Sequence, residues 1–300
     1  MSSRSKNQKT TSCSARLRFN LSACHQILPL GTETNIMGIL NVTEDSFSAD
    51  GLLEKFGKNP HAHVRYALKL INDGADIIDI GGESTRPGST PVSVDEEIRR
   101  VVPVIRRLAK KTKIPISVDT YKPEVAKQAL EAGAVIVNTI KGNNPSAALL
   151  KVIKDYKAAV VLMHMRKTPR TMQKNIFYQD LIAEILFELK KSVQKCLETD
   201  IKSDKILIDP GIGFAKTTEH NLEIIKRLKE FEVLKKPILI GTSRKSFIGK
   251  ITNKDSGERA WGTAATITAC ILNGAHIVRV HDVKQMYDVV RMSDAILNSK

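Results

Sequence analysis

Eight short runs of apolar and β-branched residues recur along the chain. They lack polar alternation over most of their length, which is typical of parallel strands that are buried on both faces. We therefore expect strands at 34–42, 75–80, 114–119, 134–138, 158–164, 205–209, 237–241 and 276–281.

Between these runs, apolar residues recur at helical spacing. Several of these segments stop at a glycine, as in NDGAD, EAGAV and LNGAH, and the next strand begins within a few residues. The expected helices are 60–74, 95–112, 122–132, 145–156, 178–200, 218–231, 257–273 and 283–297.

Eight strands that alternate with eight helices predict an α/β fold, a closed (β/α)8 TIM barrel with a short N-terminal extension. The extension, residues 16–33, would cover the base of the barrel. An open doubly wound sheet is the leading alternative, but it would have fewer strands, and no G-x-G-x-x-G follows the first strand. We expect a basic disordered tail at 1–15 and a single barrel domain at 16–300.

Composition narrows the possible partners. The 300 residues are 42% hydrophobic, enough to bury a full core, and carry a net charge of +15. This charge would suit nucleic acid, a membrane surface or a small anion. Because Lys and Arg are scattered over helix faces without aromatic interleaving, we expect no nucleic-acid partner. No apolar run approaches the ~20 residues of a bilayer span, so we expect no membrane partner.

The cysteines and the N-terminal segment bear on localisation. Four cysteines lie far apart without a C-x-x-C pair, which favours a reducing compartment. The segment MSSRSKNQKTTSCSARLRF lacks the apolar core of a secretory signal, although its acid-free, Arg- and Ser-rich character would also suit a transit peptide. We expect a cytoplasmic protein.

Polar residues stand at the C-terminal ends of the expected strands, where (β/α)8 barrels carry their functional groups. Taken singly, an Asp there would equally serve as a helix cap or a turn residue. Together they argue for a polar ligand, because buried polar groups without partners cost about 1 to 3 kcal/mol each. In chain order the strand ends supply Asn41, Asp119, Asn138, His164, Asp209, Lys245, Arg279 and His281.

The residue types indicate the ligand. Carboxylates and amides suit a flat heterocycle with N–H edges and a carbonyl. Lys245, Arg279 and His281 add cations beside the loops after strands 7 and 8, the usual phosphate region of such barrels. Arg279 and His281 are two residues apart and so share a strand face. We expect a heterocycle pocket beside a phosphate pocket.

The chain resembles the dihydropteroate synthase family from Asn35 to about Val289. The motifs that carry the resemblance are MGILNVTEDSFS, DIIDIGGESTRPGS, SVDTYKPEVA, VNTIKG, LMHMRKTPRTMQ, LIDPGIGFAKTTEHN, GTSRKSFIG and IVRVHDV. This family of transferases, the target of sulfonamides, joins 6-hydroxymethyl-7,8-dihydropterin diphosphate to p-aminobenzoate in folate biosynthesis and releases diphosphate. The resemblance implies the same small-molecule substrates and activity here.

The resemblance also implies roles for individual residues. The pterin ring would be held by Asp119, Asn138, Asp209 and Lys245. The diphosphate would face Asn41, Arg279 and His281, with Asn41 a ligand of Mg²⁺. The p-aminobenzoate slot would be formed by Phe47, Thr85, Arg86, Pro87, Phe214 and Ser243. The catalytic candidates are Asp119, Asp209, Lys245, Arg279 and His281, which would stabilise a positive pterin-methylene and a departing diphosphate in a dissociative reaction.

Four positions depart from the family pattern: Glu44 replaces Pro, Thr139 replaces Asp, and Lys167 and Ala215 each replace Gly. Two rival functions stay open. One is a pterin-binding methyltransferase of the methyltetrahydrofolate type, and the other is a non-catalytic pterin-binding homologue; SRKSF and RVH favour a diphosphate-bearing substrate. We also expect a homodimer, since the helix at 257–273 is apolar enough to include an interface, although core packing would explain it as well.

Overall fold

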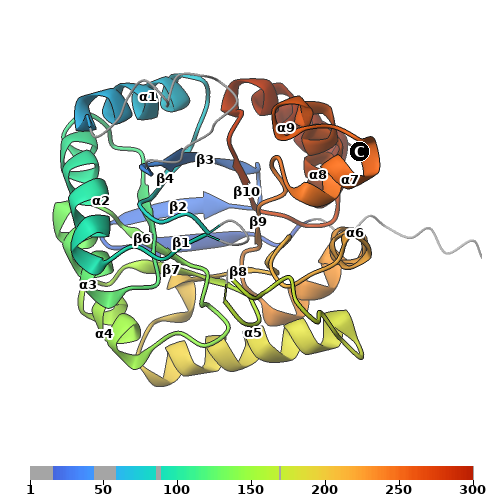
Figure 1. The fold of residues 1–300 in the computed structure, drawn as a ribbon, viewed down its shortest axis with the longest axis horizontal. Helices are drawn as coiled ribbons and strands as arrows, with labels where there is room; N and C mark the ends of the chain where they lie inside the picture. The colour runs from blue at the N-terminus through green and yellow to red at the C-terminus, as the bar shows by residue number, and fades with distance from the viewer. Residues whose placement is uncertain (1–15, 44–58, 86–88, 169, 300) are drawn as a thin grey trace, which may run out of the picture.

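The computed structural model describes residues 16–43, 59–85, 89–168 and 170–299. In this part of the chain, eight parallel strands form a barrel that is ringed by helices (Figure 1). The strand order is β8-β7-β6-β5-β4-β3-β10-β9, and a bridge between Ile208 and Ile238 closes the sheet between β8 and β9. The (β/α)8 barrel is therefore confirmed, whereas the expected tail at 1–15 lies outside the described residues.

The barrel strands follow the apolar runs closely. They are β3 Asn35–Asn41, β4 Ile77–Gly81, β5 Ile116–Asp119, β6 Ile136–Thr139, β7 Ala159–Met163, β8 Ile206–Asp209, β9 Leu239–Ile240 and β10 Ile277–Val280. Every residue of β4, β6, β7 and β8 is buried. This burial explains the missing polar alternation, because helices cover one face of each strand and the barrel core covers the other.

The described helices include all eight that the pattern predicts. They are α1 Pro60–Asn72, α2 Val94–Ala109, α3 Pro123–Ala132, α4 Ala147–Asp155, α5 Leu181–Glu198, α6 Thr218–Lys226, α8 Ala260–Leu272 and α9 Val283–Asn298. Side-chain caps fix several starts: Ser93 accepts from the amide of Glu96 at α2, and Ser146 accepts from that of Leu149 at α4.

The structure corrects two details of the prediction. The expected helix 218–231 is divided into α6 and the 3₁₀ segment η2 Leu228–Leu234, and a further helix, α7 Ser246–Thr252, follows β9. Two more 3₁₀ segments are η1 Ser203–Lys205 and η3 Ser256–Glu258. A helix of seven residues is too short to show a recognisable apolar period.

The N-terminal extension forms a hairpin of β1 Phe19–Ala23 and β2 Gln26–Leu30. Its inward side chains Leu21 and Leu28 belong to one buried cluster with Met37 and Ile77 from the barrel strands. The hairpin thus covers the base of the barrel, as expected, and leaves the opposite end, where the strands finish, for a ligand. Among the helices that the structure describes, none has the length and apolar character needed to cross a membrane.

Candidate active site

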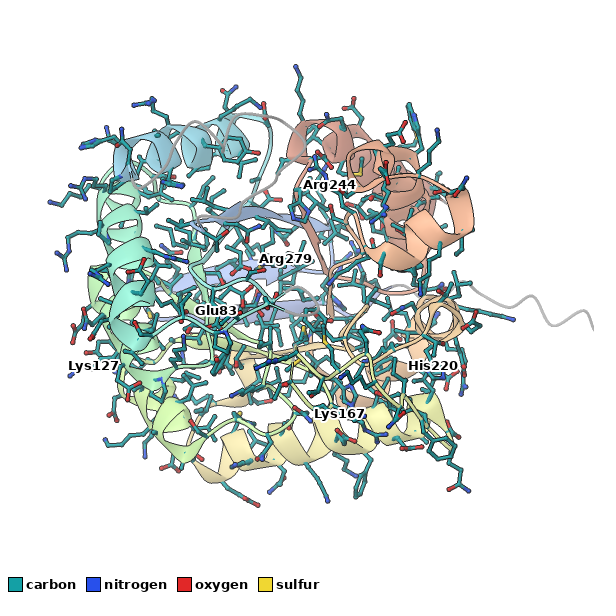
Figure 2. All side chains as sticks on the ribbon, viewed as in Figure 1. Glu83, Lys127, Lys167, His220, Arg244 and Arg279 are labelled. Carbon is teal, nitrogen blue, oxygen red and sulfur yellow. The ribbon has the colours of Figure 1, made fainter. Side chains whose placement is uncertain are left out.

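A cavity of about 470 Å³ opens at the C-terminal ends of the barrel strands. Its lining brings together ten of the residues expected from the sequence, which come from opposite sides of the barrel: Asn41, Thr85, Asp119, Asn138, Asp209, Phe214, Ser243, Lys245, Arg279 and His281. Figure 2 places Arg279 inside the ring of helices, whereas Lys127 of α3 points outward. Three residues expected in the p-aminobenzoate slot, Phe47, Arg86 and Pro87, lie outside the described residues, as does Glu44.

Arg279 links two carboxylates on the cavity floor. Its Nε donates to Asp79 Oδ2 at 2.6 Å, and its Nη2 donates to Asp119 Oδ2 at 2.9 Å. Asn138 Nδ2 donates to the same oxygen of Asp79 at 3.0 Å. Asp79 is fully buried in the middle of β4 and was missed by the reading of strand ends. The signal that could have found it is a charged residue inside the apolar run IIDIG, which needs a buried partner.

The two carboxylates expected to hold the ligand have raised pKa values. Burial raises the pKa of Asp119 to about 7, although the Arg279 charge acts in the opposite direction. Burial raises the pKa of Asp209 to about 6, against the amide of Gly211, which donates to Asp209 Oδ1 at 2.7 Å. Both groups therefore titrate near neutral pH and would gain from N–H donors on a bound ring.

A glycine lies between two of the site residues. A Cβ at Gly81, the last residue of β4, would lie 3.8 Å from Asn41 Oδ1 and 3.5 Å from Asp119 Cβ. Asn41 and Asp119 end the strands on either side of β4. A side chain at Gly81 would therefore project between them.

Another part of the lining carries a lysine, a histidine and an aromatic ring. Lys245 Nζ lies 4.2 Å from the centre of the Phe214 ring, a distance that allows a cation–π interaction. Ser243 Oγ lies 3.0 Å from His281 Nδ1 and accepts a hydrogen bond from the His281 amide at 3.2 Å. The cavity thus combines buried acids with Lys245, Arg279 and His281, an arrangement suited to a ligand with a ring and an anionic group.

A family model described as "Pterin binding enzyme" matches residues 37–281. The chain belongs to the pterin-binding enzyme family. A relative named dihydropteroate synthase, from Synechocystis, is 46% identical over 89% of this chain and 91% of its own length.

Solved structures of dihydropteroate synthases resemble the fold of this pterin-binding enzyme. That of Yersinia pestis, with a sulfonamide drug complex, has a TM-score of 0.87 at 36% identity and covers 94% of this chain and 100% of its own. That of Xanthomonas albilineans, with 4-aminobenzoic acid, has a TM-score of 0.85 at 38% identity and covers 95% of this chain and 100% of its own.

The position expected for His164 is wrong. His164 follows β7, but it is fully buried and is absent from the cavity lining. Its Nδ1 lies 3.1 Å from Lys216 Nζ, and its Nε2 lies 3.1 Å from Glu188 Oε2 of α5. The ring therefore lies between the loop after β8 and α5. Sequence alone identifies the end of a strand but not the direction in which the next residue turns.

The loop after β4 is fixed at both ends by Lys122. Its Nζ donates to Glu83 Oε2 at 2.6 Å and to the carbonyl of Val92 at 2.7 Å, and it also pairs with Glu97 of α2 at 2.6 Å. Glu83 lines the cavity and lies inside the ring of helices in Figure 2. The sequence did not predict this role for Lys122, which it indicated only as the first residue of the expected helix 122–132.

Two of the departures from the family pattern lie at strained backbone positions. Lys167 has φ +64° and Ala215 has φ +51°, in the left-handed region that favours glycine. The third departure, Thr139, is fully buried, and its Oγ1 accepts from the amide of Lys141 at 3.3 Å. Thr139 therefore bonds the turn that follows β6.

Proposed function

We propose that the protein is a dihydropteroate synthase. It would condense 6-hydroxymethyl-7,8-dihydropterin diphosphate with p-aminobenzoate to give 7,8-dihydropteroate and diphosphate. The observation that carries the proposal is the single cavity that gathers two buried carboxylates, Asp119 and Asp209, with Lys245, Arg279 and His281. The activity named for its relatives supports the same choice.

The pterin ring would occupy the acid-lined floor. Asp119 and Asp209 would accept hydrogen bonds from ring N–H groups, while Asn138 and Lys245 would hold the remaining polar edge. As the bond to the diphosphate lengthens, positive charge develops on the pterin-methylene. The two carboxylates would stabilise that charge through the ring, in a cavity where solvent screens little.

The diphosphate would lie beside His281, Arg279 and Asn41. Arg279 is paired with Asp79 and Asp119. We therefore expect it to keep its ion pair with one of these carboxylates, beside the pterin, while it contacts the leaving diphosphate. Neutralising the departing charge makes diphosphate a better leaving group. The amine of p-aminobenzoate would then attack as a neutral nucleophile, and it would need no strong base.

Mg²⁺ is proposed as the metal, with Asn41 as its protein ligand. A carboxamide oxygen in the cavity lining fits a hard cation that takes most of its ligands from phosphate and water. Among the described residues, no cluster of three or more His, Cys, Asp or Glu would hold a metal without the substrate. When bound, the ion would supply positive charge to the leaving diphosphate.

The p-aminobenzoate slot would be lined by Phe214, Ser243 and Thr85, which face the cavity, together with Phe47, Arg86 and Pro87. The aromatic ring of Phe214 suits a flat aryl amine. The 4-aminobenzoic acid in the Xanthomonas structure supports this choice of second substrate.

We also propose a cytoplasmic homodimer. Helices α8 and α9 pack side by side (Figure 1) and expose large apolar side chains, among them Trp261 at 85%, Met292 at 64% and Ile296 at 54%. Exposed apolar groups of this size favour an interface. Sedimentation equilibrium of the wild type and of Trp261→Glu would test the dimer: a wild-type monomer would contradict it.

The decisive test of the function is diphosphate release with both substrates, with and without Mg²⁺. We expect release that depends on p-aminobenzoate and on the metal. Pterin binding without turnover would point to the non-catalytic homologue. Methyl transfer from methyltetrahydrofolate to a corrinoid protein, without diphosphate release, would point to the methyltransferase.

A further inference from the structure

Lys216 is a buried lysine directly behind the cavity wall. It directly follows the loop 210–215, of which Ile212, Gly213 and Phe214 line the cavity. The residue is only 3% exposed, and its Nζ forms no ion pair with any residue that the structure describes. Burial lowers the pKa of its ammonium group to about 7.

Such a lysine is costly for the fold. The ammonium loses its hydration and gains no carboxylate in direct contact. An apolar side chain of similar length would fill the same space without that cost. The groups that Nζ contacts therefore indicate what the lysine contributes.

Lys216 Nζ donates to the carbonyl of Phe214 at 2.9 Å and lies 3.1 Å from His164 Nδ1. Burial lowers the pKa of His164 to about 4, so the ring is neutral near pH 7 and accepts at Nδ1. On its other side, His164 Nε2 faces Glu188, whose Oε1 accepts from Arg166 Nε at 2.8 Å. Lys216 is thus linked through His164 to Glu188 of α5, and it also contacts the loop 210–215 at the carbonyl of Phe214.

The loop 210–215 depends on such contacts because its backbone is irregular. Gly211, Gly213 and Ala215 have φ of +74°, +82° and +51°, which excludes the repeating hydrogen bonds of a helix or strand. Within the loop, the Phe214 amide donates to the Gly211 carbonyl at 3.1 Å, and side chains add further contacts: the Gly213 amide donates to Asn221 Oδ1 at 2.7 Å. Lys216 holds the next residue, Phe214, at its carbonyl.

Phe214 connects this contact to the cavity. Its ring lies 4.2 Å from Lys245 Nζ, and both residues line the cavity. A shift of the Phe214 backbone would move the ring and release the lysine head group from it.

We propose that Lys216 is a positioning residue, which fixes Phe214 from behind and, through the Phe214 ring, sets Lys245 Nζ in the cavity wall. The identity of the substrates used to test this rests on the proposed function. The competing explanation is that Lys216 serves stability alone.

The first test compares two buried lysines in steady-state kinetics. Lys205 is the matched control, since its Nζ also donates to a backbone carbonyl, that of Lys157, but at the base of the barrel. We expect Lys216→Met to raise the KM for p-aminobenzoate about tenfold with a smaller change in kcat, because wall contacts act on ground state and transition state alike. Lys205→Met would lower Tm and leave KM unchanged. An unchanged KM in Lys216→Met would overturn the proposal.

A double-mutant cycle tests whether Lys216 acts through the ring. In a Phe214→Leu background, Lys216→Met should raise KM by less than about threefold, because the ring it positions is already gone. Full additivity of the two changes would overturn the route through Phe214. Should Lys216→Met not fold, Lys216→Leu, which likewise removes the donor, would replace it in both experiments.

Hydrogen exchange separates this proposal from the proposed function. In Lys216→Met, the amides of residues 211–215 should exchange faster than in the wild type, whereas Lys205→Met should leave them unchanged. This result is expected whether or not the wild type releases diphosphate. Unchanged exchange in the loop would overturn the positioning role, and absent turnover in the wild type would overturn only the function.

Discussion

At the scale of single residues, the cavity floor depends on how two carboxylates share one guanidinium. Arg279 bonds both Asp79 and Asp119, and these acids together raise its pKa although burial lowers it. Asp79 is fully buried, whereas the side chain of Asp119 is 11% exposed and faces the cavity. Asp79 therefore anchors the guanidinium, and Asp119, which faces the cavity, is available to a ligand.

Pterin affinity should depend on pH through these acids. A ring N–H bonds an ionised carboxylate best, and the pKa values of Asp119 and Asp209 are about 7 and about 6. Affinity for 6-hydroxymethylpterin should therefore fall as pH drops from about 8 to 5.5, by up to about tenfold per unit for each group that must lose a proton. Calorimetry across this range measures it.

The variant Asp119→Asn should flatten the upper part of that pH profile and weaken binding at pH 8. The exposed Asp155→Asn is the control, and it should keep the wild-type profile. A wild-type slope near pH 7 in Asp119→Asn would mean that another group carries the pH dependence.

Asp79→Ala should destabilise the protein by about 3 kcal/mol, since breaking a buried ion pair leaves an uncompensated charge. Arg279 keeps Asp119 as a partner, which places the loss at the lower end of the usual range. Urea unfolding measures this. Asp73→Ala, which removes an i,i+4 pair with the exposed Lys69, is the control and should cost less than about 1 kcal/mol. Equal losses in the two variants would contradict the anchoring role of Asp79.

At the scale of elements, the sequence predicts the strands and helices that carry a repeating pattern, and it misses short helices and the directions of side chains in turns. Eight strands and eight helices could be predicted because burial on both faces and helical spacing each leave a pattern over many residues. The seven residues of α7 leave no such pattern. Asp119 and Asp209 were found because they end strands, whereas Asp79 lies within one, and His164 turns away after its strand. Side-chain direction in loops depends on tertiary contacts that one sequence does not show.

Ala215→Gly should stabilise the protein by about 0.5–1 kcal/mol. A left-handed alanine costs about 1–2 kcal/mol, of which the greater freedom of glycine in the unfolded chain offsets a part. Ala126, fully buried within α3, is the control: Ala126→Gly should destabilise by at least about 1 kcal/mol. Thermal unfolding compares them. A lower Tm for Ala215→Gly would show that the Ala215 methyl packs well enough to outweigh its backbone strain.

At the scale of the whole molecule, the two ends of the described chain meet at the base of the barrel. Arg16 Nη2 pairs with Asp294 Oδ1 of α9 at 3.1 Å, and Arg16 Nη1 donates to Thr34 Oγ1 at 2.6 Å and to the carbonyl of Ala275 at 2.7 Å. Thr34 precedes β3 and Ala275 precedes β10. One buried cluster thus ties the N-terminal extension and the last helix to the starts of two neighbouring strands, at the end of the barrel opposite the cavity.

Because this buried cluster and the cavity lie at opposite ends of the barrel, we expect Asp294→Ala to lower stability without changing catalysis. The side chains of Arg16 and Asp294 are 2% and 6% exposed, so removing the carboxylate leaves a guanidinium buried without its charge partner, at a cost of about 3–5 kcal/mol. The Thr34 amide, which donates to Asp294 Oδ2 at 2.7 Å, loses its acceptor as well.

The double variant Arg16→Met with Asp294→Leu should recover much of the loss, because an apolar pair needs no desolvation of charge. Urea unfolding and steady-state kinetics on the same preparations test both statements. The KM for p-aminobenzoate should match the wild type at temperatures where each variant is folded. A KM that rises in Asp294→Ala would show that the base of the barrel and the cavity are coupled. A loss of unfolding free energy below about 1 kcal/mol in Asp294→Ala would show that water or Thr34 compensates the charge of Arg16.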